Sequence, residues 1–217
     1  MMTLVIKAIL CDLDGTLYKS NQYDAEIKKK TIETVAEKLG VTQNKAKNLI
    51  KEAKMTCITL TRSLDYIGVS RHAFFEELSK RLDYSGLLKP NPRIKELIDE
   101  IHELGYKFAI VTNSGRPHAL NTMGALNLPI SCLDALVTSS EVEPKISSRP
   151  YLRALALLQV TANEAISVGD RIDVDLKPAK ELGIYTVLVS KKSVKSLWVD
   201  STIESPFMLI DLLKMLR

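Results

Sequence analysis

The sequence has few cysteines and no pair of them at metal-binding spacing. Cys11, Cys57 and Cys132 are odd in number and widely separated, and no CxxC motif occurs in the 217 residues. A disulfide framework or a thiolate zinc site would need more cysteines at closer spacing. The sequence therefore indicates neither kind of site.

Long hydrophobic runs are also missing. The N-terminal apolar stretch is interrupted by Lys7 and ends at Asp12, so it is too short to span a membrane. It also lacks the cleavage site of a signal peptide. We therefore expect a cytoplasmic protein with no membrane-inserted segment.

No charge of one sign is in large excess. The formal net charge is +4, and the densest basic run is Lys28-Lys29-Lys30, which we interpret as a solvated helix face. A protein that holds a nucleic-acid polymer needs a concentrated basic surface, so we expect no such partner. Apolar residues make up 46% of the chain and charged residues 26%, as in ordinary globular proteins.

What the sequence does contain is a pair of carboxylates directly after an apolar stretch. Asp12 and Asp14 lie in the segment LCDLDGTLY, whose first leucine is also the last residue of the apolar run LVIKAIL. In a strand, residues two apart point to the same side and lie about 6–7 Å apart. Two like charges there repel unless a cation or a shared proton lies between them. The pair therefore predicts a site that also holds positive charge.

Short apolar strands alternate with helical patterns along much of the chain. We predict strands at 4–11, 107–112, 135–138, 165–169 and 185–190, and helices at 93–104, 116–126, 148–158 and 174–182. Alternation with fully apolar strands is typical of an α/β protein with a Rossmann-like parallel sheet sandwiched by helices. We interpret Trp198 and residues 203–216 as a last edge and a packing helix.

Residues 19–88 break this alternation because their patterns are strongly helical. We expect a helix from Asp24 to Leu39, a second that starts after Thr42 and continues into the sixties, and a third after Ser70. Because the segment begins beside the carboxylate pair, we interpret it as a helical cap inserted after the first strand; the alternative is a set of helices that only cover the sheet. The predicted domains are an α/β core of residues 1–18 and 89–217 and a helical cap domain of residues 19–88.

Polar residues follow four of the predicted strands. They are Asp12 and Asp14, then Thr112-Asn113-Ser114, then Lys145, and finally Gly169-Asp170 with Asp173 and Asp175. The carboxyl ends of parallel strands form the edge at which ligands bind in open α/β sheets. We therefore expect these groups to share one site.

Together these groups can hydrolyse a phosphate ester. The carboxylates of Asp12, Asp14 and Asp170 are hard oxygen ligands, which suit Mg²⁺, and Lys145 adds positive charge. An ionised Asp12 can then attack phosphorus to form an aspartyl-phosphate. Asp14 can protonate the leaving oxygen and later deprotonate the attacking water.

Four further positions are expected to contact the substrate and its phosphate. The Thr112 hydroxyl and backbone N–H groups beside Asn113 can hold phosphoryl oxygens as part of the catalytic machinery. Gly15 allows a sharp turn without steric cost, and we expect Gly15, Thr16 and Asn113 to bind the substrate.

The whole set resembles the haloacid dehalogenase-like (HAD) superfamily, in its phosphatase branch with a C1-type helical cap. The matching residues are Asp12-Leu13-Asp14-Gly15-Thr16, Thr112-Asn113, Lys145, and Gly169-Asp170 with Asp175. The resemblance implies that Asp12 is the nucleophile, that Asp14 is the acid/base, and that Mg²⁺ is held by Asp12, the Asp14 backbone carbonyl and Asp170. It implies a supporting metal contact for Asp175 and no fixed role for Asp173.

The cation of the third motif has two candidates. Lys145 lies 25 residues before Asp170 and fits the family spacing, whereas Arg149-Pro150 resembles the Lys-Pro pair that the family often carries there. We favour Lys145, and an arginine would supply the same charge.

Outside the motifs, the side chains of Tyr18, Asn21 and Tyr23 are candidates to face the leaving group. The three histidines lie at no metal-ligand spacing, and we expect His118 on a helix surface although it follows the second motif.

The predicted function is Mg²⁺-dependent hydrolysis of a small phosphomonoester, which is the expected partner molecule. Nucleoside monophosphates, phosphoglycolate and sugar phosphates are the candidate substrates, and residues 82–97 faintly resemble pyrimidine 5′-nucleotidase-like members. The alternatives are a 2-haloacid dehalogenase, a non-catalytic phosphate-binding HAD-like module, a phosphate-accepting receiver domain and a nuclease. Halide-releasing relatives generally lack the second aspartate, so Asp14 favours phosphate. No feature of the sequence predicts an oligomeric state.

Overall fold

A six-stranded sheet forms the centre of the protein. The computed structural model describes residues 5–192 and 194–216, so Leu4, the first residue of the predicted first strand, lies outside the described residues. The strand order is β3-β2-β1-β4-β5-β6, and all neighbouring strands are parallel. The strands are β1 (Ala8–Cys11), β2 (Lys107–Val111), β3 (Ala135–Val137), β4 (Ala165–Gly169), β5 (Tyr185–Val189) and β6 (Ser201–Ile203). The predicted α/β class and parallel sheet are confirmed.

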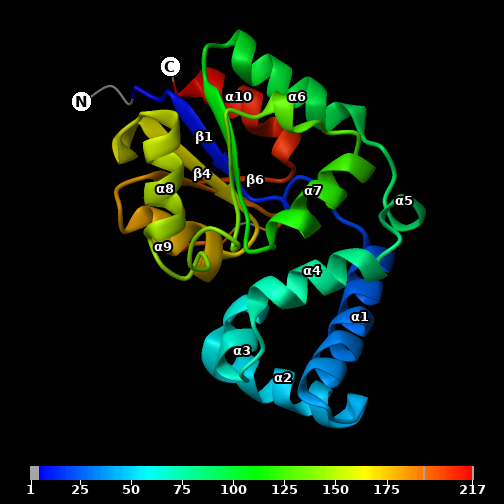
Figure 1. Ribbon diagram of the computed structural model, residues 1–217. Coiled ribbons are helices and arrows are strands. Elements are labelled where there is room, and N and C mark those ends of the chain that lie inside the picture. Colours follow the sequence, from blue (N-terminus) through cyan, green and yellow to red (C-terminus); the bar gives the residue numbers. More distant parts are fainter. Residues whose placement is uncertain (1–4, 193, 217) are drawn as a thin grey trace.

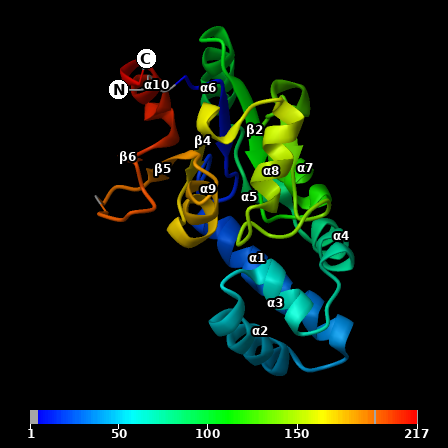
Figure 2. The same ribbon diagram turned by 90° about the vertical axis from the view of Figure 1, so that its left-hand side faces the viewer.

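Helices cover both faces of the sheet (Figures 1 and 2). Side chains alternate along a strand, so Ile9 and Cys11 of β1 pack in one hydrophobic cluster with α6 (Pro92–Glu103), while Ala8 and Leu10 pack in another with α8 (Arg149–Leu158). Both faces are apolar, which is why the strand sequences show no polar alternation. The other α-helices after α6 in the described residues are α7 (Arg116–Ala125), α9 (Lys177–Lys180) and α10 (Leu209–Met215).

The chain reverses its direction of travel across the sheet at β1. This strand pairs with β2 on one side and with β4 on the other, with Cys11 opposite both Ile110 and Val168. The crevice beyond the carboxyl ends of strands at such a switch point is the usual ligand site of open α/β sheets. Residues directly after β1, β2 and β4 therefore meet there.

Five helices lie between β1 and α6 in the chain. They are α1 (Asn21–Leu39), α2 (Gln43–Cys57), α3 (Leu60–Tyr66), α4 (Arg71–Arg81) and α5 (Tyr84–Leu87). In Figure 1, α1 to α4 stand together beside the sheet, and α4 packs against α7. The side-chain hydroxyls of Ser20, Thr42 and Ser70 cap α1, α2 and α4, as is usual at helix N-termini.

The prediction of one helix from residue 43 into the sixties is wrong. Helix α2 ends at Cys57, where Ile58 has a positive φ of 63°, and the Thr59 side chain caps a separate helix, α3. A β-branched residue rarely adopts this conformation, so no propensity pattern signals the break. The Ile58 carbonyl accepts a hydrogen bond from Arg171, which lies in the segment after β4.

The predicted helix at 174–182 also differs. A single π-helical turn covers Ile172–Leu176, and α9 follows at Lys177–Lys180. Such turns often occur at functional sites, and this one carries Asp175.

Within the described ranges, no helix has the length and hydrophobicity that a membrane span requires.

Candidate active site

The carboxylate pair lies at the carboxyl end of β1. The Asp12 backbone N–H donates to the Val168 carbonyl, so the ladder between β1 and β4 continues to this residue. Gly15 then turns the chain with φ of 89°, and a Cβ there would lie 2.9 Å from an oxygen of Asp170. The turn therefore needs glycine both for its backbone conformation and for the close approach of Asp170.

Lys145 supplies the positive charge that the pair requires. Its ammonium group forms an ion pair with Asp12 and lies 2.7 Å from Asp175 Oδ1, and its side chain is buried. Burial raises the pKa of Asp12 to about 7, while Lys145 opposes that rise. Burial alone would lower the pKa of Lys145, but the two carboxylates raise it overall. Lys145 is therefore charged at neutral pH.

Arg149, the alternative cation, lies outside the site. Its side chain is 70% exposed and pairs with Glu143 at 3.0 Å. The structure therefore brings Lys145, and not Arg149, to Asp12.

Three carboxylates meet beside Lys145. One oxygen each from Asp12, Asp170 and Asp175 lies within 4.8 Å of the others. Asp175 Oδ2 accepts from the Arg171 backbone N–H at 2.9 Å, whereas Asp170 Oδ1 is buried and has no hydrogen-bond partner among the described residues. Asp173, in contrast, is exposed.

The Asp14 side chain is not part of this cluster. Its Oδ1 accepts from the Tyr18 hydroxyl at 2.5 Å, and its Oδ2 accepts from Ser114 at 2.8 Å and from Thr112 at 3.4 Å. These hydroxyls come from the turn after β1 and from the end of β2. The sequence placed Thr112 and Ser114 at this edge but did not show that they hold Asp14.

Two residues expected to bind substrate also form hydrogen bonds with protein groups. The Thr16 hydroxyl donates to Asp12 Oδ2 at 3.1 Å. The Asn113 side-chain oxygen accepts from the Lys145 backbone N–H at 2.7 Å, and its backbone carbonyl accepts from the Thr61 hydroxyl at 2.9 Å. Both residues therefore position neighbouring groups in this structure.

The carboxylates open into a cavity of about 200 Å³. Asp12, Asp14 and Lys145 line it from the sheet, while Thr61 and Phe75 are among the residues that line it from the helices between β1 and α6. A Cβ on Gly115 would lie only 2.4 Å from the Phe75 Cβ. The two sides of the cavity are therefore in direct contact.

The expectation that His118 lies on a helix surface is wrong. Its side chain is buried, lines the same cavity and is hydrogen-bonded to the Tyr84 hydroxyl at 2.9 Å. The Tyr23 hydroxyl lies 3.4 Å from its other ring nitrogen and 2.8 Å from Thr122. Burial lowers the pKa of His118. Tyr23 is therefore a buried packing residue, and Asn21 is exposed.

Comparison with known proteins agrees with this geometry. A family model described as haloacid dehalogenase-like hydrolase matches residues 9–189. A glyceraldehyde 3-phosphate phosphatase of Methanocaldococcus jannaschii is 27% identical over 98% of this chain and 99% of its own length. A phosphoglycolate phosphatase of Aquifex aeolicus is 28% identical, with 96% and 97% covered. The crystal structure of a HAD phosphatase from Thermococcus onnurineus shares the fold, with a TM-score of 0.73, 22% identity, and 96% of this chain and 98% of that chain covered.

Proposed function

Because the chain belongs to the haloacid dehalogenase-like hydrolase family and is a phosphatase of that family, we propose that it hydrolyses a small phosphomonoester through an aspartyl-phosphate on Asp12, with Mg²⁺ as its cofactor. The observation that carries this proposal is one cavity that holds Asp12, Asp14, Thr112 and Lys145 together. Each of the four has a separate role in that chemistry.

The carboxylate cluster fits a divalent cation. Asp170 Oδ1 is a buried oxygen without a partner among the described residues, and such a group costs free energy unless something compensates it. Oxygen donors alone suit Mg²⁺ better than softer metals. We assign Asp12, the Asp14 backbone carbonyl and Asp170 to the ion, with Asp175 in support. When bound, Mg²⁺ would neutralise charge on the phosphoryl oxygens.

In the first step a bond forms between an Asp12 oxygen and phosphorus, and the bond from phosphorus to the ester oxygen breaks. Asp14, in its acid form, gives its proton to the departing oxygen. The Lys145 ammonium group and the Thr112 hydroxyl stabilise charge on the transferring group. Thr16 and Lys145 hold the Asp12 carboxylate in place, through the contacts described above.

In the second step water attacks phosphorus and the bond to Asp12 breaks. Asp14, now ionised, takes the proton of that water. The products are inorganic phosphate and the free enzyme. The hydroxyls of Tyr18 and Ser114 keep Asp14 at one position through both proton transfers.

We further propose that residues 19–88 form a cap domain over a core of residues 1–18 and 89–217. This segment supplies one wall of the catalytic cavity, including Thr61 and Phe75. The small volume, about 200 Å³, favours a sugar phosphate or phosphoglycolate over a nucleoside monophosphate, because pockets for larger molecules run from about 300 Å³ upward. The relatives named above act on substrates of that size.

The test is phosphate release from a panel of phosphomonoesters, with Mg²⁺ and with EDTA. We expect release only with Mg²⁺, and no chloride release from a 2-haloacid. Asp12→Asn should abolish turnover, while Asp173→Asn, an exposed control in the same segment as the metal ligands, should not. Rapid acid quench should trap a phosphorylated protein in the wild type only. Full activity in EDTA would exclude the cofactor, and an active Asp12→Asn variant would exclude the nucleophile.

A further inference from the structure

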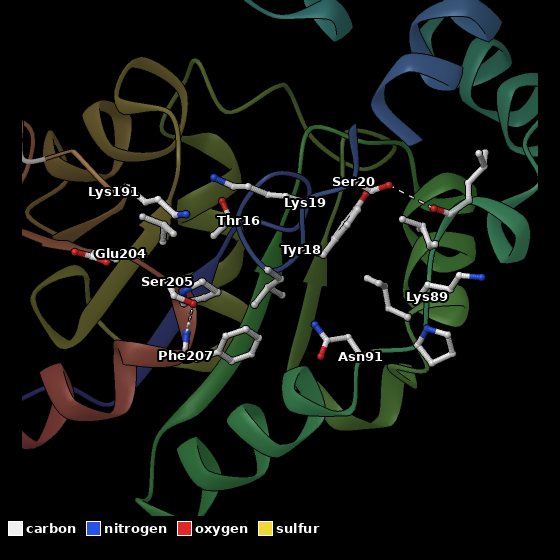
Figure 3. Close-up of a pocket in the computed structure, with 17 residues that line it drawn as sticks. Thr16, Tyr18, Lys19, Ser20, Lys89, Asn91, Lys191, Glu204, Ser205 and Phe207 are labelled. Atoms are coloured by element: carbon white, nitrogen blue, oxygen red, sulfur yellow. Dashed lines mark hydrogen bonds between the residues drawn. The ribbon is translucent and has the colours of Figure 1, made fainter. Parts of the chain in front are cut away.

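A second cavity lies on the other side of the turn that carries the catalytic carboxylates. It has a volume of about 730 Å³, and none of its lining residues lines the catalytic cavity. Figure 3 shows it, and we call it the linker cavity. It is bounded by residues 16–20 and 87–91, which connect the sheet to the helices between β1 and α6, and by residues after β5 and β6.

The cavity has an excess of positive charge over negative charge. Lys19, Lys89 and Lys191 line it, and Glu204 is the single carboxylate among its described lining residues. No carboxylate oxygen of the described residues forms an ion pair with any of these lysines within 4.0 Å. Elsewhere on this surface lysines do find partners, as Lys180 does with Asp200.

Two of these lysine side chains point toward one another. In Figure 3 the side chains of Lys19 and Lys191 extend toward one another on the side of the cavity where Thr16 lies, while Lys89 extends away from them. Glu204 points outward from the cavity in the same view. Two exposed ammonium groups that extend toward the same side of a cavity favour the binding of an anion there. An anion with several acceptor oxygens, such as a phosphate, fits such a pair.

The remainder of the cavity suits an uncharged body attached to that anion. Leu126 and Phe207 are among the apolar residues of its wall. Asn91 precedes α6 at the capping position, but its side chain makes no capping hydrogen bond. In Figure 3 this side chain extends into the cavity. Its amide is therefore available as both donor and acceptor.

We propose that the linker cavity is a second binding site, for an organic phosphate whose phosphate lies between Lys19 and Lys191 and whose uncharged part contacts Asn91 and the apolar wall. The volume accommodates a body as large as a nucleoside, which the catalytic cavity does not.

Occupancy of this site would act on the catalytic site through two contacts. Thr16 and Tyr18 line the linker cavity and also donate hydrogen bonds to Asp12 and Asp14. The two connecting segments are already joined by a hydrogen bond from Ser20 to the Leu87 carbonyl. A ligand that contacts both segments would restrain the movement of the helices relative to the sheet, and such movements often limit turnover.

The test uses adenosine 5′-monophosphate as the probe, titrated calorimetrically into the full chain in EDTA. We expect saturable binding that is tighter than that of adenosine or of inorganic phosphate. Lys19→Gln and Lys191→Gln should each weaken it about tenfold, the loss of one charge-assisted contact. Asn91→Ala should weaken binding of the nucleotide but not of inorganic phosphate. Lys192→Gln, an exposed neighbour that does not line the cavity, is the matched control.

Kinetics provide a second readout. With p-nitrophenyl phosphate as substrate, the nucleotide should lower the release of p-nitrophenol to a non-zero plateau, and Lys191→Gln should shift this effect to higher concentration. Two results would overturn the proposal. One is the absence of saturable binding at millimolar nucleotide. The other is binding or competitive inhibition that is equal in the wild type and in both lysine variants, because the probe would then occupy the catalytic cavity.

Discussion

The ammonium nitrogen of Lys145 lies 2.7 Å from Asp175 Oδ1, and the same group also forms an ion pair with Asp12. One buried cation thus joins two buried carboxylates from distant parts of the chain, Asp12 directly after β1 and Asp175 on the π-helical turn that follows β4. Removing one partner of a buried ion pair leaves uncompensated charge and is strongly destabilising. Lys145 should therefore contribute to the stability of the site, in addition to the catalytic role proposed for it.

Lys145→Met should lose both turnover and stability. We expect the free energy of unfolding to fall by about 3–5 kcal/mol in EDTA, measured by urea denaturation, and part of that loss to be recovered in Mg²⁺. The control is Arg149→Gln, since the Arg149 side chain is exposed, and its effect should stay within about 0.5 kcal/mol. A Lys145→Met protein as stable as the wild type would contradict the burial of an obligatory ion pair.

Asp14→Asn should affect poor leaving groups most. An alkyl phosphate needs a proton on its departing oxygen, so its single-turnover rate should fall by about 10²- to 10⁴-fold. The loss should be much smaller for p-nitrophenyl phosphate, whose leaving group is stable without a proton. The two substrates measured on one protein sample control for folding. Equal losses for both would show that Asp14 does not act as the acid.

The sequence predicts the sheet edge well because its signals are local. Each strand is an apolar run, and the residue types after β1, β2 and β4 are unusual enough to mark a site. The break at Ile58 and the π-helical turn that carries Asp175 were missed, because tertiary contacts stabilise backbone conformations that local patterns do not favour. The environment of His118 was missed for a related reason.

His118 lies among residues that are distant in the sequence. Tyr23 and Tyr84 reach it from α1 and α5, and no pattern within α7 indicates that those helices will cover this face. From the sequence alone, a lone histidine near the start of a helix is therefore predicted to lie on the surface. Only the packing of the inserted helices shows that it is buried.

The burial of His118 predicts a pH dependence of stability. Burial lowers its pKa in the folded protein, while Asp14 opposes that change and Tyr23 and Tyr84 face the ring without charge. In the unfolded chain this histidine has a pKa of about 6.5. As the pH falls through that value, His118 therefore takes up a proton in the unfolded chain before it does so in the folded protein. This contribution is fully present above that pH and is lost as the pH falls, with a slope of at most about 1.4 kcal/mol per pH unit.

The measurement is urea denaturation between neutral and mildly acidic pH. His118→Gln should have a shallower decline in unfolding free energy than the wild type, whatever its stability at neutral pH. His72→Gln is the control, because the His72 side chain is 66% exposed. Parallel declines in the wild type and His118→Gln would show that this histidine is not held neutral by the fold.

The contact between α4 and α7 should control access to the catalytic cavity. A Cβ on Gly115, the N-cap residue of α7, would lie 2.4 Å from the Phe75 Cβ, whereas a Cβ on Gly124 within α7 meets nothing within 4 Å. Gly115→Ala should therefore push α4 away and destabilise the protein by about 1–3 kcal/mol through overpacking. Gly124→Ala should instead stabilise it by up to about 1 kcal/mol, since alanine is the better helix former. The Thr61 hydroxyl also donates to the Asn113 carbonyl from the inserted helices. Displacing those helices should weaken this contact, so Gly115→Ala should raise KM for small phosphomonoesters, whereas Gly124→Ala should leave KM unchanged. Urea denaturation and initial rates of phosphate release on the two variants measure both effects, and equal behaviour of the two would show that the helices do not close on the site through this contact.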